Sequence, residues 1–479
     1  MPEAVTRDGR TPARSQELIA SLGPLLLTWL PRQRWFAGKG RPVNGFTVVS
    51  ATELLPPGAV PRLLHVLVRA EQSSPTGPTA DCYQLLVGVR RTLPPSLAPA
   101  LIGRPERGPL RGATVYDALY DPRLADVLLE ALRMRARVGE LRFERTGATE
   151  IPSGLVPRVL GAEQSNSSLV YGDTFILKLF RRIVPGTHPD LELPLALATE
   201  GCRRVPPPAA WFCADVGARG TAVDEGTASA RREGALVLGV LQPFLKSADD
   251  GWELALDSLA RGGPFTPQAH ALGRATAEVH GALARALPPV SLGRAQIEAL
   301  SRSMANRLDT TARAVPALRP YADGLRTAFE ALGELGTGQL SWTAQRVHGD
   351  LHLGQCLRAP DGEWSLIDFE GEPARPLAER RLPQPTVRDV AGMLRSFDYA
   401  ARQYRPWSPD WADDCRAAYC TGYAEVSGRD PRHEPVLLRA YETDKAVYEV
   451  LYEARHRPDW LPVPLAAVAR LATPSLPRP

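Results

Sequence analysis

The segment 346–370 constrains the fold of this 479-residue chain more than any other part of the sequence. It reads RVHGDLHLGQCLRAP, then DGE, then WSLIDFE. Two short apolar runs flank the turn-forming residues PDGE, and this pattern predicts a β-hairpin. Such a hairpin would bring Gln355 and Asp368, which lie at its two ends, close to each other and to Asp350.

These polar residues are of the types that phosphoryl transfer requires. Asp350 could orient and deprotonate a hydroxyl, while the amide of Gln355 and the carboxylate of Asp368 could hold Mg²⁺. A zinc site formed by His348 and His352 is the alternative. It is disfavoured because HGDLH contains glycine and no third ligand is evident. We expect His348 to brace the loop, and His352 either to contact substrate or to pack.

An upstream strand–turn–strand pattern, AEQSNSSLVYGDTFILKLF, supplies a second set of candidates. In its turn, hydroxyl and N–H groups could bind phosphate oxygens. Lys178 lies inside an alternating strand, where a charge must find a partner. Glu192, on a helix expected at 188–201, is the predicted partner. The turn residues concerned are Ser165, Asn166 and Ser167.

Composition and length bound the remaining possibilities. The chain has 44% apolar and 23% charged residues and a net charge of +4, which are typical of a soluble globular protein and give no reason to expect nucleic acid or a membrane as partner. Six scattered cysteines form no C-x-x-C pair, so reduced thiols are expected. The N-terminus lacks the apolar core of a signal peptide, and the apolar run near it is shorter than the ~20 residues that span a bilayer. A cytoplasmic location is therefore predicted.

Three regions are predicted along the chain. Residues 1–105 are expected to form an N-terminal subdomain with an antiparallel sheet and one helix. Residues 106–245 read as a second, β-rich subdomain, and residues 246–479 as a helical lobe that carries the catalytic and metal-binding loops. Long helices are expected at 267–287, 387–401 and 442–460 within this last region.

The string H-G-D-L-H-L-G-Q followed by I-D-F-E resembles the catalytic and metal-binding loops of the protein-kinase-like aminoglycoside phosphotransferase superfamily. The resemblance implies an α+β, bilobal protein-kinase-like fold that uses ATP and Mg²⁺. Gln355 stands where that superfamily usually has Asn, which leaves metal binding possible but altered. By the same resemblance, Lys178 and Glu192 would hold phosphates, and Asp389 would brace the catalytic loop. Two further positions would meet adenine and one would assist the metal: Gln242, Phe244 and Glu370.

A narrower resemblance covers nearly the full chain. The segments LPRQRWFAGKGR, EQSNSS, HGDLHLGQ, RDVAGMLRSFDYAA and ETDKAVYEVLYEARHRPDWLPVPL look like those of actinobacterial maltokinases. This implies an extra N-terminal cap subdomain at 1–105. It also implies a phosphotransferase with an alcohol acceptor, which converts maltose to maltose 1-phosphate at the anomeric hydroxyl for α-glucan (glycogen) synthesis, with a trehalose synthase as a possible partner.

The C-terminal helix offers candidate sugar contacts. One of its faces mixes aromatic and charged side chains, which could stack on sugar rings and bind their hydroxyls. A solvated face with charge pairs is the alternative. In the stretch WFAGKG, Lys39 either approaches the nucleotide or lies in a solvated turn. The predicted sugar contacts are His352, Lys445, Tyr448, Glu449 and Tyr452.

Two other functions remain open from the sequence. The motifs for ATP chemistry do not separate maltose from another acceptor, such as glucosamine or an aminoglycoside. A non-catalytic scaffold that binds a trehalose synthase is the alternative of a different class, and Gln355 is the residue that raises it.

Overall fold

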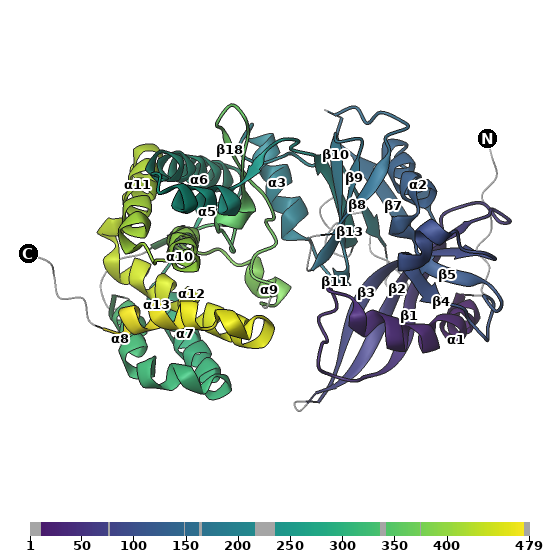
Figure 1. The fold of residues 1–479 in the computed structure, drawn as a ribbon, viewed down its shortest axis with the longest axis horizontal. Coiled ribbons are helices and arrows are strands. Elements are labelled where there is room, and N and C mark those ends of the chain that lie inside the picture. Colours follow the sequence, from purple (N-terminus) through teal and green to yellow (C-terminus); the bar gives the residue numbers. More distant parts are fainter. Residues whose placement is uncertain are drawn as a thin grey trace, which may run out of the picture. The chain divides into compact units, whose positions relative to one another are not determined.

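The structure is a computed structural model that describes residues 11–74, 77–147, 149–161, 165–215, 235–335, 342–373 and 375–473. The chain divides into two compact units. The first unit comprises Met1–Leu191 and Pro208–Lys246, and the second comprises Glu192–Pro207 and Ser247–Pro479. Strands dominate the first unit and helices dominate the second (Figure 1).

The first unit begins with helix α1 (Thr11–Trp29) and an antiparallel sheet. Its strands follow the order β1-β2-β3-β5-β4, with β11 paired to β3. The antiparallel sheet and the helix predicted for this part of the chain are confirmed. Trp35 and Phe36 are buried beside the ring of Tyr83, at centroid distances of 6.0 and 5.3 Å, so they anchor the core of this sheet. The strands are β1 (Val43–Glu53), β2 (Arg62–Ser74), β3 (Gly77–Arg90), β4 (Leu101–Gly103), β5 (Thr114–Asp117) and β11 (Arg182–Ile183).

A second sheet of seven strands, in the order β6-β7-β12-β13-β10-β9-β8, completes the first unit. Helix α2 (Pro122–Arg133) packs beside it, with the side chain of Asp121 capping the first turn. Gln84 on β3 ties the two sheets together, since its amide donates to the carbonyls of Phe180 and Leu238, both at 2.8 Å. The strands are β6 (Arg137–Val138), β7 (Leu141–Arg145), β8 (Pro157–Leu160), β9 (Asn166–Tyr171), β10 (Phe175–Phe180), β12 (Ala210–Ala214) and β13 (Leu236–Pro243).

Helices form most of the second unit, and α3 (Pro189–Thr199) runs into it from the first. The helices expected at 267–287 and 387–401 are confirmed as α6 and α10. Helix α12 begins earlier than the 442 expected, because Pro435 fixes the backbone of its first turn. The helices are α5 (Gly251–Arg261), α6 (Thr266–Ala286), α7 (Arg294–Ala314), α8 (Ala322–Leu335), α9 (Leu377–Arg380), α10 (Val387–Gln403), α11 (Pro409–Ser427), α12 (Pro435–His456) and α13 (Pro462–Ala472).

Helices α6 and α11 approach each other through glycines. A Cβ at Gly273 would lie 2.1 Å from the carbonyl oxygen of Tyr419, and one at Gly422 would lie 2.0 Å from that of His270. No larger residue fits at either position unless the helices separate. This contact fixes the spacing of two helices that also carry side chains behind the loop that holds Asp350.

The hairpin predicted around the turn residues PDGE is present. Strands β17 (Cys356–Arg358) and β18 (Trp364–Leu366) pair antiparallel, with β14 (Asp249–Asp250) beside β17. Gly362 closes the turn with a φ of 91°, a conformation that glycine adopts without steric cost. A separate pair, β15 (Val290–Leu292) and β16 (Trp342–Ala344), leads into the loop that holds Asp350.

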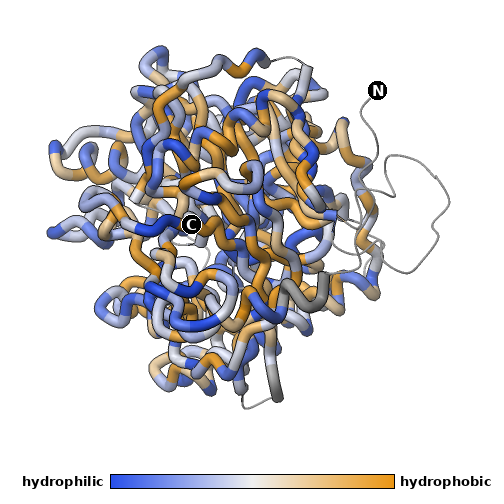
Figure 2. Tube along the Cα trace, turned by 90° about the vertical axis from the view of Figure 1, so that its right-hand side faces the viewer, coloured by the Kyte–Doolittle hydropathy of each residue, from blue (hydrophilic) through white to orange (hydrophobic). Residues whose placement is uncertain are grey.

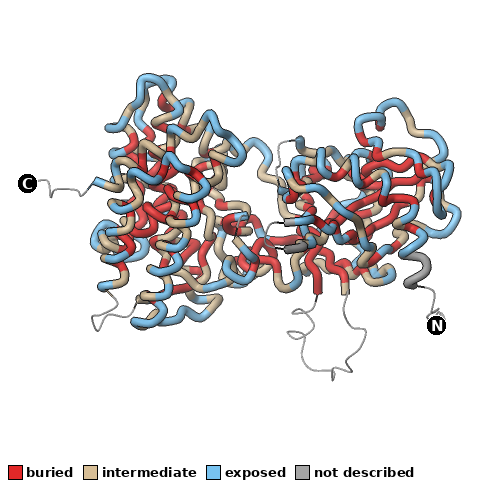
Figure 3. The backbone as a smooth tube through the Cα atoms, turned by 90° about the horizontal axis from the view of Figure 1, so that it is seen from below, coloured by how far each residue is buried: buried red, intermediate tan, exposed pale blue. Residues whose placement is uncertain are grey.

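Apolar and polar residues alternate along the trace in Figure 2, and buried residues gather in the interior of each unit in Figure 3. The core of the second unit includes Phe397, Leu394 and Val390, which lie on one stripe of α10. Over the described ranges, no helix combines the length and the apolarity needed to cross a membrane.

Candidate active site

The loop that holds Asp350 is anchored by Asp389 in the first turn of α10. The carboxylate of Asp389 accepts the backbone N–H groups of His348 and Gly349, both at 2.8 Å. His280 on α6 lies 3.0 Å from the same carboxylate, and its other ring nitrogen lies 2.9 Å from the hydroxyl of Tyr423 on α11. Burial raises the pKa of Asp389, but His280 and the other partners outweigh it, and the net pKa is lowered. The predicted bracing role of Asp389 is confirmed.

His348 is also structural. It is 2% exposed, its Nε2 lies 2.8 Å from the carbonyl oxygen of Ile367, and its ring packs against Phe369. Its Nδ1 faces the backbone N–H of Asp350 at 3.4 Å. Both ring nitrogens therefore meet backbone groups, which leaves neither for a zinc ion. Burial lowers the pKa of His352, so this ring is neutral at physiological pH.

The hairpin brings Gln355 and Asp368 together, as predicted. The side-chain N–H of Gln355 donates to the Asp368 carboxylate at 3.0 Å, and its backbone carbonyl accepts the N–H of Ile367 at 3.0 Å. Asp368 has a φ of 67°, a left-handed conformation that is rare for a residue other than glycine and that is often found at functional sites. Carboxylate and amide oxygens suit a hard divalent cation, so this pair fits Mg²⁺. Glu370, two residues further on, is fixed through its backbone carbonyl by Arg380 at 2.9 Å.

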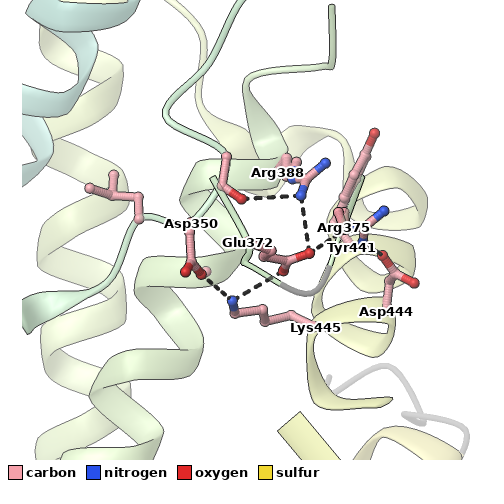
Figure 4. Close-up of a pocket in the computed structure, with 10 residues that line it drawn as sticks. Asp350, Glu372, Arg375, Arg388, Tyr441, Asp444 and Lys445 are labelled. Carbon is pink, nitrogen blue, oxygen red and sulfur yellow. Dashed lines mark hydrogen bonds and ion pairs between the residues drawn. The ribbon is translucent and has the colours of Figure 1, made fainter. Parts of the chain in front are cut away.

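The Asp350 carboxylate contacts a lysine that comes from the C-terminal part of the chain. The Nζ of Lys445 on α12 lies 2.7 Å from Asp350 and 3.2 Å from Glu372 (Figure 4). Burial lowers the pKa of Lys445, but the carboxylates of Asp350 and Glu372 raise it more, so the lysine carries its charge at all physiological pH values.

A cluster of ion pairs lies beside this contact, and the sequence does not predict it. Glu372 accepts hydrogen bonds from Arg375 and, at 3.2 Å, from Arg388, which also donates to the carbonyl of Gly349 at 3.1 Å. Burial raises the pKa of Glu372, but three cations outweigh it and lower the pKa. Asp444 pairs with Arg375 at 3.0 Å. Glu372 and Arg375 are distant in the sequence from α12, and nothing in their spacing indicates a partner there.

The predicted sugar contacts on α12 separate into two groups. Tyr448 and Tyr452 stack with ring centroids 6.2 Å apart, and Lys445 lies over the Tyr448 ring at 4.8 Å. Glu449 differs from its prediction, since its carboxylate pairs with the buried Arg395 of α10 at 2.6 Å. The physical reason is helical geometry: Glu449 is rotated about 100° from Tyr448 around the helix axis, toward α10.

The ion pair predicted between Lys178 and Glu192 is not formed. Lys178 on β10 pairs with Asp190 at 2.9 Å, and not with Glu192 as expected. Glu192 pairs instead with Arg346 at 2.7 Å. Residues two apart on a helix point about 200° away from each other, so Asp190 and Glu192 cannot serve the same lysine side by side.

The predicted phosphate-binding turn is described only in part, because Glu163 and Gln164 lie outside the described residues. The amide of Asn166 donates to the hydroxyl of Ser165 at 3.2 Å, while the hydroxyl of Ser167 accepts from Arg181 at 2.8 Å. Arg181 is in turn paired with Asp117 at 2.8 Å. The Ser167 hydroxyl therefore already has a protein partner.

The two residues predicted to meet adenine lie in and directly after the last residues of β13. Gln242 pairs with Ile176 of β10 in the sheet register, and the backbone N–H of Phe244 donates to the carbonyl of Thr174 at 2.8 Å. Arg158 lies over the Phe244 ring at 5.7 Å. Lys39 is exposed, and no contact of its side chain assigns it a role.

Part of the chain matches a known domain family, and most of its length is similar to known kinases. Residues 29–121 match the maltokinase N-terminal cap domain. The chain is 29% identical over 369 residues to a glucosamine kinase of Streptacidiphilus jiangxiensis, which covers 71% of this chain and 79% of that protein. A glucosamine kinase of Mycolicibacterium smegmatis is 29% identical over 340 residues, which cover 66% of this chain and 79% of that protein.

A solved structure shares the fold. The structure of a glucosamine kinase in complex with glucosamine, ADP and inorganic phosphate superimposes with a TM-score of 0.65 at 23% identity, covering 96% of this chain and 99% of the other. The α+β, kinase-like fold with an N-terminal cap that the sequence predicts is confirmed. The chain is therefore similar to sugar kinases over most of its length, and its N-terminal part matches the maltokinase cap domain.

Proposed function

We propose that this kinase transfers the γ-phosphoryl group of ATP to the anomeric hydroxyl of a neutral sugar, with maltose as the acceptor. The observation that carries the proposal is the carboxylate of Asp350. The backbone around it is held by Asp389 and Arg388, and its side chain is held by Lys445 at 2.7 Å. A fixed carboxylate next to a charge-rich pocket is what positions an acceptor hydroxyl for phosphoryl transfer.

In the proposed reaction, Asp350 accepts a hydrogen bond from the sugar hydroxyl and takes its proton. The hydroxyl oxygen then forms a bond to the γ-phosphorus, and the bond from that phosphorus to the bridging oxygen of ADP breaks. Gln355 and Asp368 would hold Mg²⁺, which neutralises phosphate charge when bound. Lys178, oriented by Asp190, would bind phosphate oxygens. Catalysis would then consist of positioning and charge neutralisation.

The charges around Asp350 favour a neutral acceptor. Each carboxylate of the cluster is already matched by at least one cation, so none is left to bind the ammonium group of an amino sugar. Four cations face three carboxylates, and this excess of positive charge disfavours a further cation. The cations are Arg307, Arg375, Arg388 and Lys445, and the carboxylates are Asp350, Glu372 and Asp444.

A hollow of about 580 Å³ adjoins this cluster and has room for a sugar of more than one ring. It shares Arg375 and Asp444 with the pocket at Asp350, and Tyr448 lines it. Polar side chains from α7 line its other side, which suits the many hydroxyls of a disaccharide. These side chains are Ser303, Asn306 and Thr310.

Glucosamine is the second candidate acceptor. Two relatives at 29% identity are named glucosamine kinases, and the structure that shares the fold contains glucosamine. Maltose and glucosamine therefore differ in what supports them: the charge balance of this chain supports the first, and its relatives support the second. The implied supply of maltose 1-phosphate to α-glucan synthesis and the pairing with a trehalose synthase stay predictions.

The test is a panel of sugars with ATP and Mg²⁺, in which phosphorus NMR identifies the product. We expect turnover with maltose and a phosphate at the anomeric carbon. Turnover with glucosamine and none with maltose would select the second candidate. ATP consumption with neither sugar, or a phosphate at another carbon of maltose, would refute the proposal as stated. A chain that turns over no sugar at all would fit the scaffold alternative.

A further inference from the structure

The side chains of both partners in the Lys445–Asp350 ion pair are largely shielded from solvent. Lys445 comes from α12, and Asp350 lies in the loop before η5 (Leu353–Gln355). Their side chains are 14% and 17% exposed, and the charged atoms are 2.7 Å apart. At this distance and burial, salt screens the attraction much less than it does at an exposed pair.

Glu372 does not explain why Lys445 is present. The carboxylate of Glu372 already pairs with Arg375 and Arg388, so its charge is compensated without the lysine. The contact of Lys445 with Glu372 is also the longer one, at 3.2 Å. Asp350 has no such second cation, because Lys445 is the one charged group paired with it among the residues that the structure describes. The lysine therefore acts chiefly on Asp350, and Glu372 helps to hold the lysine.

The other hydrogen bonds of the loop do not fix the direction of the Asp350 side chain. Asp389 fixes the backbone N–H groups of His348 and Gly349, and Arg388 fixes the carbonyl of Gly349. These bonds place the Cα of Asp350, but they do not set the direction of its carboxylate. A base that takes a proton must lie within about 2.6–3.2 Å of it, so direction matters as much as position.

We infer that Lys445 is a positioning residue for catalysis, which fixes the direction of the Asp350 carboxylate toward the acceptor hydroxyl (Figure 4). The inference rests on the proposed role of Asp350 as the base, but not on the identity of the sugar. It changes the role of Lys445 from the predicted sugar contact to a residue that acts through Asp350.

The test compares Lys445→Met with Lys445→Arg, using the sugar that the wild-type kinase turns over best. Methionine keeps the length of the side chain and removes the charge, so we expect kcat to fall about 100-fold while the KM for ATP stays within about 2-fold. Arginine keeps the charge, and we expect it to restore kcat to within about 10-fold of wild type. Arg455→Met, an exposed cation on the same helix, is the matched control and should leave kcat unchanged.

A double-mutant cycle with Asp350→Asn separates positioning from a structural role. If Lys445 acts through Asp350, then Lys445→Met should lower kcat less than about 2-fold in the Asp350→Asn background. An equal loss in both backgrounds would overturn the inference. The inference would also be overturned if Lys445→Arg were as inactive as Lys445→Met and both variants melted at equally lowered temperatures relative to wild type. Failure of the proposed function is a different result, since the wild-type kinase would then turn over no sugar of the panel.

Discussion

The side-chain N–H of Gln355 donates to the carboxylate of Asp368 at 3.0 Å, and the two residues face each other at the open end of the β17–β18 hairpin. The residue that departs from the usual superfamily pattern is therefore in contact with the second predicted metal ligand. Gln355→Leu should lower the apparent affinity of the kinase for Mg²⁺ by about 10–100-fold, because the amide is lost while the hairpin is kept. Titration of activity with Mg²⁺ measures this. Gln296→Leu, at an exposed position of α7, serves as the control, and equal titration curves for both variants would argue against a metal role.

Asp350→Asn should abolish most turnover and spare the fold. The amide cannot take a proton from the sugar, so kcat should fall about 10²–10⁴-fold. Binding of ADP, measured by calorimetry, should change less than about 2-fold. Asp361→Asn, in the hairpin turn, makes the same chemical change at an exposed site and should be as active as wild type. Near-normal turnover of Asp350→Asn would remove Asp350 from the mechanism.

The partner of Lys178 can be tested by two neighbouring substitutions. Because Lys178 pairs with Asp190 and Glu192 pairs with Arg346, Asp190→Asn should weaken ADP binding about 10-fold, which corresponds to the loss of one charged hydrogen bond. Glu192→Gln should have a smaller effect on ADP binding. Calorimetry on the two variants decides between them, and the reverse order of effects would restore the pairing that the sequence predicted.

Glu449 should contribute to stability and not to sugar binding. Its partner Arg395 is 1% exposed, so Glu449→Leu leaves a buried cation whose remaining ion-pair partner in the described part of the chain is Asp398, at 3.0 Å. Loss of one partner of a buried pair costs about 3–5 kcal/mol. Urea unfolding should show a loss of this size, while the KM for the sugar stays within about 2-fold. Tyr448→Ala should show the opposite pattern, and a sugar defect in Glu449→Leu would contradict the assignment.

The Glu372 cluster predicts how stability depends on pH. The pKa of this carboxyl is lowered in the folded protein by Lys445, Arg388 and Arg375. The stabilisation is therefore fully present above the unfolded pKa of about 4.3, and it is lost as the pH falls toward the folded pKa. Glu372→Gln should be less stable than wild type at pH 7, and the difference should narrow below about pH 4. Melting temperatures of the two proteins across this range measure it, and a constant difference would exclude Glu372 as the cause.

What could be predicted from the sequence was mostly local. Gln355 and Asp368 lie 13 residues apart, and one hairpin is enough to join them. Helix positions on α6 and α10 also followed from periodicity. The partner of Lys178 could not be predicted, because Asp190 and Glu192 are equally plausible until the rotation of α3 about its axis is known.

Helix α12 shows the other limit of the sequence. It is buried on several sides, so its polar residues face different neighbours, and periodicity alone cannot say which face meets which. Lys445 meets the catalytic loop, while Glu449, one turn later, meets Arg395. The ion pairs of Glu372 and Asp444 depend on segments distant in the sequence, and no local pattern indicates such contacts.

The Asp350–Lys445 contact joins residues 95 positions apart in the chain. During synthesis, a ribosome completes the motif HGDLHLGQ and the hairpin well before it reaches α12. A nascent chain, or one cut short by a premature stop codon before α12, would contain every predicted catalytic and metal-binding residue and still lack the lysine that orients the base. We therefore expect a chain cut before α12 to turn over sugar far more slowly than the chain that includes α12, although its predicted catalytic and metal-binding residues are all present.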